Sequence, residues 1–211
     1  MSKYAFVGLD YAEVYVYPTS LTSINVATFF YNTGITTAYC AHVDDPNKEN
    51  EIGLLDFGGL SGNWELASAL RHAINVKKVH FPGKVTKAHG ADTFGTNGHY
   101  ATMAYTKMWF GSNPEPQDGV VDMSNITVSE IGANAFMSAY NITTLILPDG
   151  CESIAATAFN GAPKTADAGK VMSQFKTVMQ PTYHAGVAEY CAANGLSYVD
   201  YNGNELKAPE N

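Results

Sequence analysis

The stretch ITTLILPDGCESIAATAFNG, residues 142–161, decides the fold. A short apolar run ends at Pro148, and Ile154 and the pair Ala158 and Phe159 follow behind it. Proline ends a strand because it cannot donate the next ladder hydrogen bond. The stretch therefore predicts a short strand, a turn, and an irregular or short helical return whose apolar residues fill the space between successive coils.

The same arrangement recurs along the chain. Residues 14–30, VYVYPTSLTSINVATFF, and residues 77–94, KKVHFPGKVTKAHGADTF, repeat the order of apolar run, proline and phenylalanine. ITVSEIGANAF sets Phe136 23 residues ahead of Phe159. A period of 20 to 50 residues is typical of repeat architectures. One coil cannot bury its own apolar edge, so we expect the coils to stack on one another.

A longer period runs over these coils. Residues 53–82 align without a gap to residues 119–148, at an offset of 66 residues that pairs Asp56 with Asp122. Since 66 is three times 22, we predict a super-unit of three coils. The apolar runs predict strands near residues 14–17, 38–43, 54–57, 79–81, 105–110, 120–123, 145–147 and 175–179.

Composition and charge exclude several classes of protein. The chain has 211 residues, 45% of them hydrophobic, which is enough for a real core. Its net charge of −8 repels phosphate backbones and anionic lipids, so we expect no nucleic-acid partner. No signal peptide and no apolar run of about 18 residues is present, so we expect no membrane insertion and synthesis in the cytoplasm. Location at a cell surface would require the chain to be a piece of a longer protein.

Motifs for catalysis and metal binding are missing from the sequence. No P-loop, GxSxG or dinucleotide fingerprint is present. Three cysteines without CxxC spacing favour neither a disulfide framework nor a zinc site, and the spacing of His72, His80, His89 and His99 matches no metal motif. An acid pair of Asp56 and Asp122 would be three coils apart, about 14 Å at the strand spacing of a sheet, which is too far for glycoside hydrolysis. We expect no enzymatic activity, no cofactor and no metal.

The repeating residues resemble a known family. Proline, a small apolar residue, isoleucine and then Ala-Phe at a 23-residue period resemble the BspA-like leucine-rich repeats, also called the Treponema pallidum type, which occur in bacterial surface proteins and some viruses. The match is best over residues 120–162. The tail GVAEYCAANGLSYVDYNG is similar to the carboxy-terminal cap of such proteins, in which a short helix precedes a last strand.

This resemblance implies the fold class and its division. It implies a repeat solenoid, mainly β with short helical or irregular returns, that forms a leucine-rich-repeat-like parallel strand ladder over residues 1–170. A C-terminal capping segment covers residues 171–211. The pattern is irregular over residues 30–70 and 111–119, and the latter leaves too few residues for a full return.

The resemblance also implies binding or scaffolding without catalysis, through the strand face. Strand side chains alternate, so the residue between two inward neighbours points to that face. This predicts a partner-binding row of Tyr15, Asp56, His80, Trp109, Asp122 and Ile146. Tyrosine and tryptophan are enriched at interfaces, which favours Tyr15 and Trp109 as contacts. The alternative is that all six are ordinary half-buried side chains of a sheet.

Two functions follow as hypotheses. The first is a recognition module for a protein or surface glycan, as in cell adhesion. The second is a structural protein of a bacteriophage or other virion, such as a decoration, capsid or tail-associated protein that assembles into a particle or homo-oligomer. The missing secretion signal favours the second hypothesis.

Overall fold

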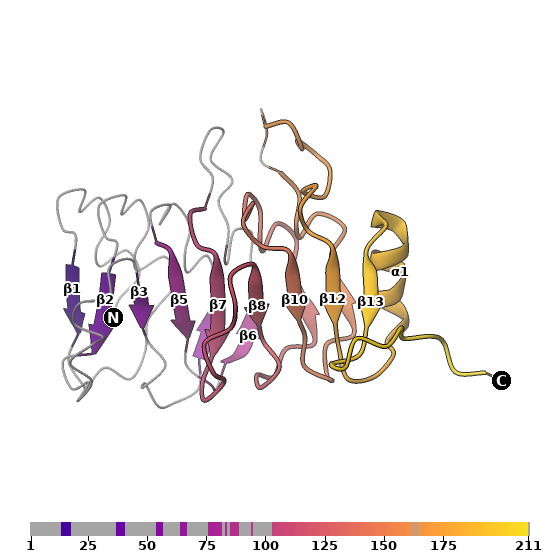
Figure 1. Cartoon of the computed structure of the whole chain (residues 1–211), viewed down its shortest axis with the longest axis horizontal. Helices are drawn as coiled ribbons and strands as arrows, with labels where there is room; N and C mark the ends of the chain where they lie inside the picture. The colour runs from indigo at the N-terminus through magenta and orange to yellow at the C-terminus, as the bar shows by residue number, and fades with distance from the viewer. Residues whose placement is uncertain are drawn as a thin grey trace.

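A computed structural model describes residues 14–17, 37–40, 54–56, 64–66, 76–81, 83, 85–88, 94, 103–161, 163 and 165–210. Nine of its strands form one sheet in which every pair is parallel. They are β1 (Val14–Tyr17), β2 (Thr37–Cys40), β3 (Leu54–Asp56), β5 (Lys78–Phe81), β7 (Lys107–Phe110), β8 (Val120–Asp122), β10 (Thr144–Ile146), β12 (Thr177–Met179) and β13 (Ser197–Val199). Their order in the sheet is their order in the chain, and Figure 1 shows them as one row.

Each of the eight stretches predicted to form strands contains a strand of this sheet. The predicted and observed bounds differ by one to three residues, and the predicted residues 41–43 lie outside the described residues. The structure therefore has the mostly parallel sheet with few helices that the sequence predicted.

The returns carry shorter strands that pair with one another. β9 (Glu130–Ile131) pairs in parallel with β11 (Ser153–Ile154), so that Ile131 lies beside Ile154. β4 (Trp64–Leu66) pairs in parallel with β6 (Val85–Ala88). The 23-residue repeat is therefore a real structural register: residues one period apart are neighbours in space.

A column of phenylalanines fills the space between the sheet and these returns. Phe136 stacks on Phe94 with ring centroids 4.9 Å apart, and Phe159 stacks on Phe136 at 4.6 Å and on Phe175 at 3.9 Å. All four side chains are buried in one core. The repeat-equivalent Phe29 lies outside the described residues.

Alternate strand residues complete the core. The buried positions are Val79, Met108, Val121, Leu145, Val178 and Tyr198, which occupy equivalent register positions in six adjacent strands. The sheet thus has a core face, covered by the returns, and an opposite face, which we call the outer face. This is the alternation that a half-buried strand requires.

The 66-residue period also corresponds to a structural interval. β3 and β8 begin 66 residues apart, and so do β5 and β10; each pair is separated by three strand steps in the sheet. The super-unit of three strands is therefore present between Leu54 and Ile146.

The C-terminal segment forms a helix and then the last strand. Helix α1 (Ala185–Asn194) ends at Gly195, whose φ of 65° is favourable for glycine, and β13 follows. Gln180, fully buried, ties β12 to this segment: its amide nitrogen donates to the carbonyls of Pro148 (2.9 Å) and Cys151 (2.6 Å), and its amide oxygen accepts from the Tyr198 hydroxyl (2.7 Å). The helix and last strand expected over the tail are both observed.

Candidate functional site

Five of the six predicted binding residues lie in one row across adjacent strands. Asp56 is in register with His80, His80 with Trp109, Trp109 with Asp122, and Asp122 with Ile146. Asp56 and Asp122 are therefore three strand steps apart, about 14 Å at the usual strand spacing. The predicted row is a real feature of the sheet, and its members from β5 onward lie on the outer face.

Tyr15 does not belong to this row. It is in register with Ala38, Ala38 with Leu55, and Leu55 with Val79, which is a core position. The prediction was one residue out of step because VYVY is apolar at every position, so its alternation does not distinguish one face from the other.

Trp109 lies in the row but is wrongly predicted as an accessible contact. Its side chain is 5% exposed, although it is not a member of the core behind the sheet. It stacks on His80 with ring centroids 4.7 Å apart and an interplanar angle of 16°. Something on the outer face must therefore cover Trp109.

The connection from β7 to β8, residues 111–119, crosses the outer face above this position; we call it the strap. Glu115 forms ion pairs with Lys78 of β5 (3.3 Å) and Lys107 of β7 (3.0 Å), both outward-facing residues. Asp118 pairs with Lys107 at 3.1 Å. Figure 1 shows this segment running from the end of β7 to the start of β8. The strap thus covers the strands that carry His80 and Trp109.

The strap is also anchored through its backbone. The Gly111 amide donates to the Phe81 carbonyl (2.9 Å), and the Gly119 amide donates to the Thr106 carbonyl (2.6 Å). The Gly111 carbonyl oxygen accepts a hydrogen bond from Nε2 of His80 (2.8 Å). Both ends of the strap are therefore fixed to the strands that it crosses.

The strap reverses the hand of the connection. The returns from β8 to β10 and from β10 to β12 run over the core face, because their Phe136 and Phe159 belong to the core. The strap joins consecutive strands over the opposite face, so its hand is the reverse of theirs. Parallel sheets strongly favour one hand for such crossovers, so a mixed arrangement needs the specific anchors that the strap has. This explains why nine residues suffice where a full return would not fit.

The strap ion pairs shift the pKa values of their members. Burial by itself would raise the pKa of Glu115, but the hydrogen bond from Lys107 and the charge of Lys78 outweigh it, so the pKa is lowered. The hydrogen bonds from Lys107 and Thr106 lower the pKa of Asp118. Burial opposes the charged form of Lys107, yet its hydrogen bonds to both carboxylates raise its pKa. All three groups are therefore held in their charged forms.

We expect acid to release the strap. The lowered carboxylate pKa values mean that the contribution of these pairs is complete above the ordinary values of 4.5 and 3.8 and is lost as the pH falls through the folded-state values. The raised pKa of Lys107 means that its contribution is lost only in strong alkali, above the ordinary 10.5. In a Trp64→Phe background, Trp109 emission should shift to the red below about pH 4 while circular dichroism still reports the folded sheet.

The matched control removes the charges without removing the strap. Glu115→Gln combined with Asp118→Asn should abolish the acid step in Trp109 emission, because no strap carboxylate remains to be protonated. An acid step of unchanged size in this double variant would show that the ion pairs do not hold the strap.

Beyond the strap, the outer face is uncovered in the described residues. We call this part the open face; its outward residues are Val120 and Asp122 of β8, Thr144 and Ile146 of β10, and Thr177 and Met179 of β12. All six are partly exposed. The open face presents hydroxyl, apolar and carboxylate groups on a regular parallel sheet.

Tyr201 lies at the far side of the open face. The turn after β13 brings its hydroxyl to the Leu147 carbonyl, 2.5 Å away, at the end of β10. The ring is 42% exposed, which makes Tyr201 an exposed large hydrophobic residue. Burial and then the nearby charges of Asp122 and Asp149 raise its pKa to about 12. Tyr201 is therefore an aromatic side chain beside two carboxylates.

A small polar cluster lies beside this aromatic ring. Asp149 accepts a hydrogen bond from the Thr182 hydroxyl, and Nε2 of His184 lies 3.7 Å from the same carboxylate oxygen. The Thr182 hydroxyl also lies 3.2 Å from Nε2 of His184. Because Thr182 donates to the carboxylate, its proton is not directed at the histidine, as nucleophilic catalysis would require. The cluster joins the loop after β10 to the start of α1.

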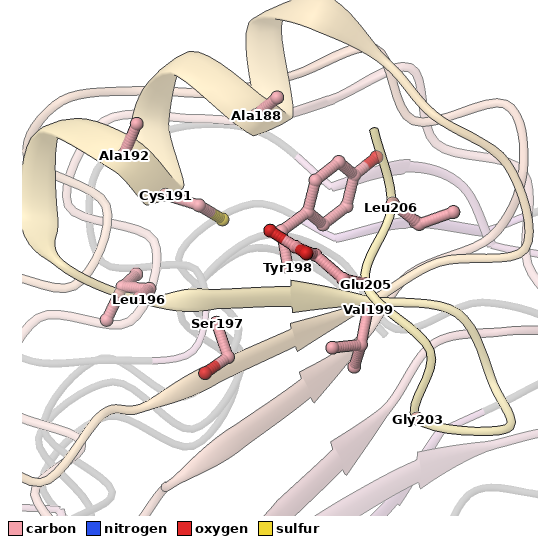
Figure 2. Close-up of a pocket in the computed structure, with 10 residues that line it drawn as sticks. All are labelled: Ala188, Cys191, Ala192, Leu196, Ser197, Tyr198, Val199, Gly203, Glu205 and Leu206. Carbon is pink, nitrogen blue, oxygen red and sulfur yellow. The ribbon is translucent and has the colours of Figure 1, made fainter. Parts of the chain in front are cut away.

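Two pockets flank helix α1. Figure 2 shows the larger, about 400 Å³, between α1, β13 and the chain at Gly203–Leu206; Ala188, Ala192, Leu196 and Leu206 supply apolar groups. Burial raises the pKa of its Cys191 to about 12, so this thiol is not a nucleophile at neutral pH. The second pocket, about 330 Å³, lies between α1 and β11.

Two negative findings apply to the described part of the chain. No three histidine, cysteine, aspartate or glutamate side chains there are grouped in a way that could hold a metal ion. No helix there has the length and apolar composition needed to span a bilayer.

Sequence reasoning missed the strap and Tyr201. The signal for the strap was available: the acidic, proline-containing segment SNPEPQDG is too short for a return and follows a strand that begins with lysine. Tyr201 had no comparable signal, because its contact with Leu147 spans 54 residues and depends on how the tail folds back.

Comparisons with known proteins identify no relative. No family model, no curated protein and no solved structure shows a significant match to this chain.

Proposed function

We propose that this chain is a non-enzymatic binding or scaffolding protein that recognises a protein or surface glycan through the outer face of its sheet. We further propose that it is a leucine-rich-repeat-like solenoid of the BspA-like type, with the solenoid in residues 1–170 and a cap in residues 171–211. The repeat pattern and the parallel register of adjacent coils support this architecture.

The observation that supports this function most is the contrast between the two halves of the outer face. The strap covers Lys78, Lys107 and the strands that carry them, whereas the open face has no described segment over it. A flat surface with partly exposed apolar and hydroxyl groups is suited to docking rather than to catalysis, since it encloses no reacting atoms.

Neutral enlargement of side chains on the open face tests the proposal. Purified protein is screened against a glycan array and a panel of matrix proteins, and the best probe is measured by surface plasmon resonance. Thr144→Gln combined with Thr177→Gln should weaken binding about tenfold, because two longer side chains obstruct the face. The matched control, Thr127→Gln combined with Thr157→Gln, enlarges exposed threonines on the return side and should change binding less than about twofold.

The outcomes of this screen separate the candidate functions. Loss of binding in the control pair, with none in the Thr144 and Thr177 pair, would place the binding surface elsewhere. A chain that binds no probe, sediments as oligomers and copurifies with particles would support the alternative, a structural protein of a bacteriophage or other virion. The apolar pocket at the end of the sheet (Figure 2) favours that alternative, because it offers a surface for self-association.

A further inference from the structure

The outer face is divided by charge, and only one half is covered. The lysines at the outward positions of β5 and β7 are matched by Glu115 and Asp118 of the strap. The other half presents Asp122, at the end of β8, and Asp149, in the loop after β10. No described segment supplies a lysine or arginine to either carboxylate.

Both carboxylates remain available for a partner. One oxygen of Asp122 accepts a hydrogen bond from the Ser124 amide at 3.0 Å, and no other described group contacts the carboxylate. The side chain of Asp149 is 65% exposed. Its nearest basic group is His184, which carries charge only when protonated. At neutral pH this half of the face is therefore acidic.

Tyr201 links the two carboxylates in space. Its hydroxyl bonds to the carbonyl of Leu147, which directly follows Ile146, the register neighbour of Asp122, and precedes Asp149 by two residues. An exposed aromatic ring near carboxylates suits a lysine or arginine side chain, whose charge interacts with both the ring and the carboxylates.

The strap shows what kind of segment this sheet can hold. It contains Pro114 and Pro116, its backbone is bonded to the strands at both ends, and its acidic side chains meet outward lysines. The complementary segment for the open face has basic side chains in place of acidic ones. Charge complementarity of this kind gives specificity and speeds association.

We propose that the open face binds an extended basic segment of a partner protein, with a lysine or arginine side chain over Tyr201 and paired with Asp122 and Asp149. This inference rests on the proposed function of the outer face and names the chemistry of its partner.

Synthetic peptides test the inference on the full chain. The probe is a capped, dye-labelled peptide of alternating arginine and threonine, compared with the same peptide carrying citrulline, the neutral isostere, at every arginine position. By fluorescence anisotropy, the arginine peptide should bind at least about tenfold more tightly than the citrulline peptide, and the difference should shrink as salt is added. Equal affinities of the two peptides, or no binding of either, would overturn the proposal.

Matched variants separate this site from general acidity. Asp122→Asn combined with Asp149→Asn should weaken binding of the arginine peptide about tenfold, and both asparagines can still accept the hydrogen bonds that these aspartates accept. Glu130→Gln combined with Glu152→Gln removes the same charge from exposed return-side residues and should leave binding within about twofold. Equal losses in the two double variants would mean that only net charge attracts the peptide, and the proposal would fail.

The failure of this inference can be told from the failure of the proposed function. If the arginine peptide does not bind, but a glycan or another protein loses affinity in the Thr144→Gln and Thr177→Gln pair, the basic partner is wrong and the binding face stands. If no probe responds to changes on the open face, both proposals fall.

Discussion

Replacing Phe159 with alanine should lower the free energy of unfolding by about 3 to 5 kcal/mol. Phe159 is fully buried and lies in the middle of the phenylalanine column, between Phe136 and Phe175. Truncation removes both ring contacts and leaves a cavity between three successive coils. Neighbours held in their own strands cannot move in to fill it, so the loss should be near the upper end of the range.

Urea denaturation followed by circular dichroism measures this effect. Phe159→Leu is the matched control, because it keeps most of the volume and should cost about 1 to 2 kcal/mol. A loss below about 1 kcal/mol for the alanine variant would mean that the column does not hold the coils together. The stacking of Phe94, Phe136 and Phe159 in one core would then be incidental to stability.

Gly111→Ala should destabilise the protein by about 2 to 5 kcal/mol, with two causes that can be separated. Gly111 begins the strap with a φ of 56°, a conformation that alanine adopts at a cost. A Cβ atom there would also lie 2.6 Å from the Cα of Gly83, which is backbone of the neighbouring turn and cannot rotate away. The two glycines pack directly on each other where the strap starts.

Two further glycines serve as controls for Gly111. Gly169 has a φ of 71° and open space around its Cβ direction, so Gly169→Ala should show the conformational cost alone, about 1 kcal/mol. Gly150 has open space and no positive φ, so Gly150→Ala should be nearly neutral. If Gly111→Ala costs no more than Gly169→Ala in urea denaturation, the close approach to Gly83 is not a real constraint.

The strands could be predicted from the sequence because their signals are local. Pro148 ends an apolar run, and the repeat then carries the same assignment to weaker copies. The pairing of Ile131 with Ile154 follows from the period alone, since residues one period apart must be neighbours when coils stack. The parallel order needed no further information.

The surface of the sheet was harder to predict because it depends on contacts distant in sequence. The burial of Trp109 could not be inferred from KMWF, because the groups on the outer face come from His80 and from the strap. Tyr15 failed for the opposite reason, since an all-apolar strand contains no information about which face is which. Alternation predicts the row of a side chain but not what lies over it.

The reversed strap limits how such a chain can lengthen during evolution. Among the connections from Leu54 to Ile146 there are two returns and one strap, and together they make the 66-residue period. Tandem duplication of a single coil would place a return where the strap belongs, or the reverse, and would lose the match of acidic loop to outward lysines. Copying the whole period preserves every link, so growth of the gene should proceed by three strands at a time, about 14 Å of added sheet.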